Sequence, residues 1–68
     1  MIKSYEYNNY LIEIHEHPIY HDFEFVVKTI DQKEVKGTSN HVYEHMYDCE
    51  IAAQILINDL WQDLKWQQ

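Results

Sequence analysis

The residue types in this chain that are best suited to metal or acid–base chemistry are five histidines, one cysteine and twelve acids. Two sets have suggestive spacing: His15 and His17 beside Glu13, and His41, His45 and Cys49 at every fourth position. Zinc takes four such ligands, and a His-x-His pair on a strand supplies two of them. Spacing alone rarely identifies a metal site, and the chain has no CxxC pair. We therefore predict no metal and no other cofactor.

Catalytic constellations are equally incomplete. Ser39, His41 and Asp48 have the residue types of a nucleophilic triad, but a triad is recognised by its geometry, which no surrounding motif defines here. Two pairs of carboxylates, Glu13 with Glu16 and Asp22 with Glu24, are also candidates for acid–base work. Such work needs a cleft that shifts their pKa values, and a chain of 68 residues has little room for one. We predict that the protein is not an enzyme.

Acidity is the stronger functional signal. The net charge is −7, no arginine is present, and residues 40–64 carry five acids without a lysine. Phosphate backbones would be repelled, so we expect no direct binding of nucleic acid, whereas a basic protein surface would be attracted. Tyrosine is abundant and is a common anchor of protein interfaces. The predicted partner-binding residues are Glu13, Glu16, Tyr20, Asp22, Glu24, Tyr43, Glu44, Asp48 and Glu50.

Period-two patterns predict three strands in the first forty residues. Residues 10–15 alternate, residues 23–30 form the strongest strand pattern, and residues 35–38 form a short third strand in which Gly37 marks a bulge or an end. Residues 5–7 either extend the first strand or form an extra edge strand. Residues 39–47 connect the sheet to a helix and hold a short strand or a turn.

Residues 48–66 are predicted to form a helix with Asp48 as its N-cap. One broad apolar stripe of this helix faces the sheet and consists of Cys49, Ala53, Leu56, Ile57, Leu60, Trp61 and Leu64. The predicted core consists of Ile12, Ile14, Phe25, Val27, Leu56, Leu60 and Leu64. A second strip of Ile51, Ile55 and Trp66 lies on the opposite side, where an exposed apolar row is typical of an interface.

The expected fold is a single α+β domain over residues 1–68, a three-stranded antiparallel sheet followed by one C-terminal helix on one face. With one cysteine, no signal peptide and no run of about 18 apolar residues, we expect a cytoplasmic protein that does not enter a membrane. Two functions remain open. The first is docking on a basic protein as an inhibitor, immunity-type partner or nucleic-acid mimic. The second is self-association as a homodimer, and a weaker third possibility is metal binding through the histidines.

Overall fold

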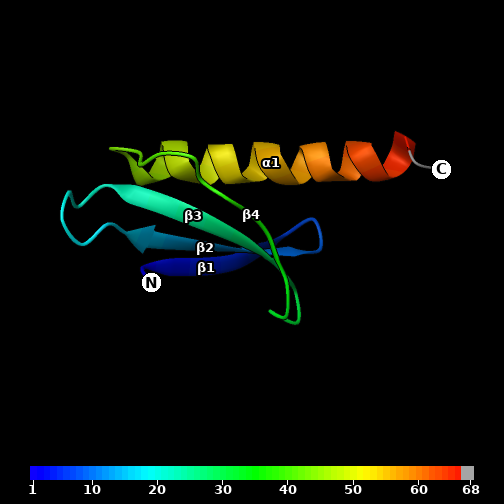
Figure 1. The fold of residues 1–68 in the computed structure, drawn as a ribbon, viewed down its shortest axis with the longest axis horizontal. Helices are drawn as coiled ribbons and strands as arrows, with labels where there is room; N and C mark the ends of the chain where they lie inside the picture. Colours follow the sequence, from blue (N-terminus) through cyan, green and yellow to red (C-terminus); the bar gives the residue numbers. More distant parts are fainter. Residues whose placement is uncertain (67–68) are drawn as a thin grey trace.

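A four-stranded antiparallel sheet with one helix lying across one of its faces makes up the protein (Figure 1). The computed structural model describes the backbone of residues 1–66 and the side chains of residues 1–63. The elements are β1 (Lys3–Tyr7), β2 (Tyr10–Glu16), β3 (Phe23–Thr29), β4 (Val35–Thr38) and α1 (Met46–Trp66). Each strand pairs with the next along the chain. The predicted α+β class is confirmed, and the predicted strand number of three is wrong.

The strand beyond the three that were predicted is β1, which pairs with β2 as an edge strand and places Tyr5 opposite Ile12. The turn between the two strands consists of Asn8 and Asn9, whose φ angles are 47° and 69°. Two successive residues with positive φ suit the tight hairpin turn whose twist matches that of paired strands. Asparagine tolerates this conformation better than other residues with a side chain, so the Asn-Asn pair decides between the two alternatives for residues 5–7.

The core lies between the sheet and the helix. Each strand residue predicted for it is buried: Ile12, Ile14 and Val27 are 0% exposed and Phe25 is 4% exposed. From the helix, the fully buried residues are Cys49, Ala53 and Ile57. They follow one another at four-residue spacing, so they form the line along which the helix touches the sheet.

The predicted helix contribution to the core is therefore partly wrong. Leu56 packs against the core but is only half-buried, and Leu60 is also half-buried. The side chain of Leu64 lies outside the described residues. The small side chains of Cys49 and Ala53 let the helix backbone approach the sheet, and Leu56 and Leu60 lie on the flank of the contact line. Leu56 lies over Gly37, and a Cβ atom on residue 37 would come within 2.8 Å of the Cδ1 atom of Leu56.

The helix begins earlier than predicted. Its first residue is Met46, and the Cys49 N–H donates to the carbonyl oxygen of His45 at 3.2 Å. Asp48 is therefore in the first turn and is not the N-cap, although its charge is still favourable at that end of the helix dipole. Within the described chain, no helix combines the length and the apolar character needed to cross a membrane.

Candidate functional site

The histidines predicted as alternative metal ligands lie on β2, in the loop between β2 and β3, and in the connection from β4 to α1. Because α1 begins at Met46, His41 and His45 precede the helix and do not align with Cys49 on one face. In the described part of the chain, no three His, Cys, Asp or Glu side chains lie close enough together to hold a metal ion. Burial raises the pKa of the Cys49 thiol to about 11, so this sulfur is a core atom in its neutral form.

The candidate catalytic groups have structural contacts. The Ser39 hydroxyl oxygen accepts a hydrogen bond from the Phe25 N–H at 3.2 Å and so helps to hold the segment after β4 against β3. Glu13 and Glu16 are three residues apart on one strand and project from opposite faces of the sheet. They therefore do not form a two-carboxylate site.

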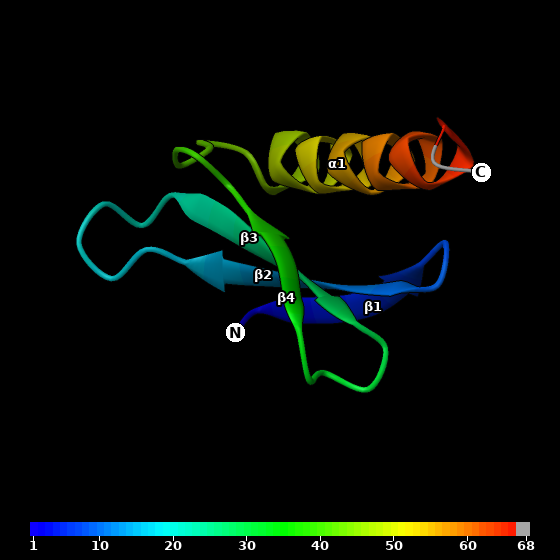
Figure 2. The ribbon, with the colours of Figure 1, turned by 45° about the vertical axis from the view of Figure 1, so that its right-hand side comes forward.

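Two acidic segments that are far apart in the sequence meet at one end of the molecule. The loop between β2 and β3 and the connection from β4 to α1 lie side by side there, together with the start of the helix (Figures 1 and 2). An isolated antiparallel bridge joins them, in which the backbone N–H groups of Phe23 and Tyr43 each donate to the other's carbonyl oxygen at 2.7 Å. This bridge places Asp22 opposite Glu44 across two neighbouring backbones.

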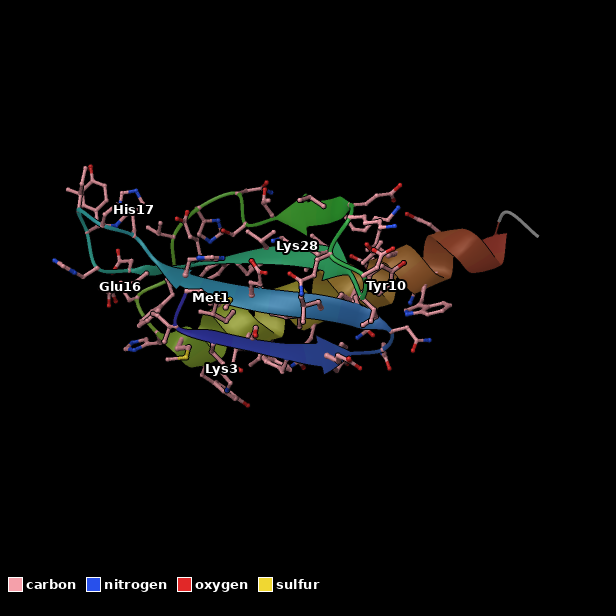
Figure 3. All side chains as sticks on the ribbon, turned by 90° about the horizontal axis from the view of Figure 1, so that it is seen from below. Met1, Lys3, Tyr10, Glu16, His17 and Lys28 are labelled. Atoms are coloured by element: carbon pink, nitrogen blue, oxygen red, sulfur yellow. The ribbon has the colours of Figure 1, made fainter. Side chains whose placement is uncertain are left out.

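We define the acidic end by the carboxylates of these segments: Glu16, Asp22, Glu24, Glu44 and Asp48. Within the described residues, none of the five is paired with a lysine. Among the described side chains, one ion pair involves this group: it joins Glu16 to His21 at 3.2 Å and exists only when that histidine is protonated. Figure 3 shows Glu16 and His17 at this end of the sheet and Tyr10 at the other. The acidic end is thus a concentration of uncompensated negative charge.

Two predicted partner-binding acids have other roles. Glu13 lies on the sheet face that the helix leaves uncovered, but it is only 7% exposed. Its carboxylate accepts hydrogen bonds from Lys28 Nζ and His15 Nε2, each at 3.1 Å. Burial alone would raise the pKa of Glu13, but the bonds from Lys28 and His15 outweigh it and hold that pKa below its ordinary value. A carboxylate paired in this way is not available to a partner.

Glu50 is also neutralised, on the helix side of the sheet. Its carboxylate contacts Lys3 Nζ at 2.8 Å, and this hydrogen bond raises the pKa of Lys3 above its ordinary value. The pair ties the first half of α1 to the edge strand β1. The predicted set of acids is therefore divided into a free group at the acidic end and two members that hold the fold together.

Exposed apolar side chains surround the acidic end. Tyr20 is 68% exposed, and its ring lies 5.0 Å from that of His17, whose Nδ1 atom accepts from two backbone N–H groups of the same loop. Ile19 and Tyr47, which the sequence analysis did not select, are each 72% exposed. The sequence could have predicted that both are exposed, because Ile19 follows Pro18 in a turn and Tyr47 lies one helical turn before Ile51 in the predicted outward strip.

The other predicted aromatic anchor, Tyr43, has a mainly structural role. It is half-buried, packs against the core and stacks on Phe25 with 6.5 Å between ring centroids. The His41 ring also packs against Tyr43, with 4.4 Å between the ring centroids. Tyr43 therefore positions the acidic end and offers a partner little free surface.

The predicted self-association strip is on the outward side of the helix. Ile51 is 37% and Ile55 is 55% exposed, and Tyr47 extends the row by one turn. The side chain of Trp66 lies outside the described residues. Two of the three predicted members are thus placed on one exposed face.

Comparison with protein-family models, with curated proteins and with solved structures finds no match for this chain. Its candidate surfaces are therefore defined by its own geometry: the acidic end, the outward helix strip, and the sheet face that carries the paired Glu13.

Proposed function

We propose that this protein is a non-enzymatic binding protein whose acidic end docks on a basic surface of another protein. The observation that supports this best is that the end of the molecule with the exposed rings of Tyr20 and Tyr47 also carries five carboxylates that have no lysine partner among the described side chains. Tyrosine supplies large, rigid contact area, and surrounding charges select the partner and speed its approach.

The arrangement of charge along the molecule favours an oriented encounter. Lys28, Lys33 and Lys36 belong to β3, β4 and the hairpin loop between them, whose turn lies away from the acidic end (Figure 2). A protein with net charge −7, five acids at one end and a lysine-bearing hairpin turned away from them attracts a basic partner toward the acidic end. A row of carboxylates also resembles a row of phosphates, so the partner class that we favour is a nucleic-acid-binding protein, and the action is inhibition or neutralisation of it.

Rigidity at the acidic end lowers the entropic cost of binding. The Phe23–Tyr43 bridge fixes the two acidic segments relative to each other, and the backbone bonds to His17 hold the loop that displays Tyr20. A backbone that is already held in place loses less freedom when a partner binds to it.

Charge reversal tests the proposal. Asp22→Lys with Glu44→Lys changes the two acids that face each other across the bridge, while Glu6→Lys with Asp63→Lys makes the same change in net charge elsewhere. Partners captured by the parent should be basic proteins. The first double variant should lose them and slow association about tenfold or more, while the control should retain most of the rate. Equal loss in both variants, or binding that ignores salt between about 50 and 300 mM, would contradict docking by the acidic end.

Self-association is the second candidate, because Tyr47, Ile51 and Ile55 form one exposed row on the outward helix face. Two such rows would bury each other's apolar surface in a homodimer, which is the commonest symmetric assembly. This function needs no acidic recognition, so insensitivity to salt together with concentration-dependent association would favour it.

A further inference from the structure

An open hollow of about 280 Å³ lies between the β1–β2 turn and the second half of the helix, far from the acidic end. In Figure 2 this turn rises toward the helix. Three asparagines and one tryptophan line the hollow: Asn8, Asn9, Asn58 and Trp61. No charged residue is among them, although twelve of the chain's 68 residues are acidic.

The walls of this hollow are held together by contacts between residues about fifty positions apart. The Trp61 indole N–H donates to the Asn8 carbonyl oxygen at 2.8 Å, and Asn8 Nδ2 donates to Asn58 Oδ1 at 3.2 Å. Tyr10 packs edge-on against Trp61, with ring centroids 6.2 Å apart. The hollow is therefore preformed, which lowers the cost of binding a ligand there.

Much of the recognition capacity of these residues is unused. Each amide side chain has two N–H donors and one carbonyl acceptor. Within the described part of the chain, the amide of Asn9 and the Nδ2 group of Asn58 make no hydrogen bond. Trp61 is 41% exposed, and since its N–H is already bonded, the ring itself is what it offers to a ligand.

We propose that this hollow binds a neutral saccharide, with one pyranose ring against Trp61 and its hydroxyl groups bonded to the amides of Asn9 and Asn58. A pyranose has an apolar face of C–H groups that suits an indole ring, and an equatorial rim of hydroxyls that both donate and accept. The volume is at the small end of ligand sites, so it fits about one sugar ring.

The lining also argues against other ligands. Anionic sugars and nucleotides find no cation in the lining and meet the repulsion of a chain with net charge −7. A free nucleobase is held best between two aromatic faces, and here Tyr10 meets Trp61 at an interplanar angle of 75°, so the two rings do not form a parallel slot. A neutral, polyhydroxylated ring satisfies both the amides and the single aromatic surface.

The test is a titration of the ¹⁵N-labelled protein with glucose and with N-acetylglucosamine, followed by NMR. The side-chain signals of Asn9, Asn58 and the Trp61 indole should move together and saturate with a Kd of roughly 1–20 mM, a range normal for so small a ligand. The side-chain amide of Asn40, which lies in the segment between β4 and α1, serves as the internal control and should not move. Sialic acid and adenosine are the anionic and planar comparison probes.

Two variants locate the site. Asn9→Gly keeps the left-handed turn residue and removes its amide, and Asn58→Ala removes the amide on the helix. Each should weaken sugar binding roughly two- to tenfold, the value of one hydrogen bond, while Asn40→Ala should leave it unchanged. The proposal is overturned if neither sugar moves the Trp61 and asparagine signals by about 50 mM. Tighter binding of adenosine or sialic acid, or equal movement of Asn40, overturns it as well. The proposal is independent of docking by the acidic end, since the two surfaces share no residue.

Discussion

Replacing Ile57 by alanine is the sharpest test of how the helix is seated. Ile57 is 0% exposed and is the largest of the three helix residues that are fully buried against the sheet, so the change removes a buried side chain and leaves a cavity. Such changes cost about 2–5 kcal/mol, whereas a domain of 68 residues has a total stability of about 3–10 kcal/mol. The variant should therefore lose a large part of its stability and unfold at a much lower urea concentration.

Ile55 supplies the matched control on the same helix. It is 55% exposed, so Ile55→Ala loses little burial and gains a few tenths of a kcal/mol from the higher helix propensity of alanine. We expect a change within about 0.5 kcal/mol of zero. Leu60→Ala should fall between the two, at about 1–2 kcal/mol, because Leu60 is half-buried.

Urea unfolding followed by circular dichroism measures all three variants, and comparable m-values would show that the same transition is being compared. Equal losses in Ile55→Ala and Ile57→Ala would refute the seating of the helix. A loss below about 1 kcal/mol for Ile57→Ala would refute the burial on which the reasoning rests.

Three further predictions concern charge, the thiol and assembly. The pKa of Glu13 is lower in the folded protein than in the unfolded chain, so its pairing stabilises the fold above the unfolded pKa, and this stabilisation is lost as the pH falls through the folded pKa. The free energy of unfolding should therefore fall between pH 6 and about 3. Lys28→Met should make that fall shallower and should lower the free energy of unfolding at pH 7 by about 1–3 kcal/mol. Unchanged acid sensitivity in Lys28→Met would contradict this. The native Cys49 thiol, with a pKa of about 11, should resist a disulfide reagent at about pH 8 and react once urea unfolds the chain, and rapid labelling of the native protein would show that the helix is not packed as described. Sedimentation at micromolar concentration should detect a dimer that Ile55→Glu weakens, and a monomer at all concentrations would leave the helix strip without this role.

Local pattern was a good guide to the strands and to the existence of the helix. Alternation identified Ile12 and Ile14 as inward residues, and the same rule placed Phe25 and Val27 beside them. This works because the side-chain period of a strand is two, so one apolar side is enough to choose the buried face. The edge strand β1 was left open because its pattern is weakly apolar, and the Asn-Asn turn that pairs it with β2 carries a conformational signal without a hydrophobic one.

The helix ends and its contact line were harder to predict. The apolar stripe is broad enough to allow several rotations, and residue size favoured the leucines as core members. Packing chose the line of Cys49, Ala53 and Ile57: the small side chains of Cys49 and Ala53 allow the helix to approach the sheet, and Ile57 fills the contact one turn further on. The approach of Leu56 to Gly37 depends on the position of β4, which the residue pattern of the helix cannot predict.

The sequence by itself determined the amount of charge, the absence of arginine, the class of the fold and the apolar identity of each strand face, since these follow from composition and local periodicity. Only the tertiary structure decided which acids are free. Glu13 is neutralised by Lys28, fifteen residues away on the next strand, while Asp22 and Glu44 become neighbours through the bridge between Phe23 and Tyr43. The hollow between Asn8 and Trp61 likewise joins residues about fifty positions apart. Contacts at such separations depend on strand register and on where the helix lies across the sheet, and those are properties of the whole chain that no local pattern encodes.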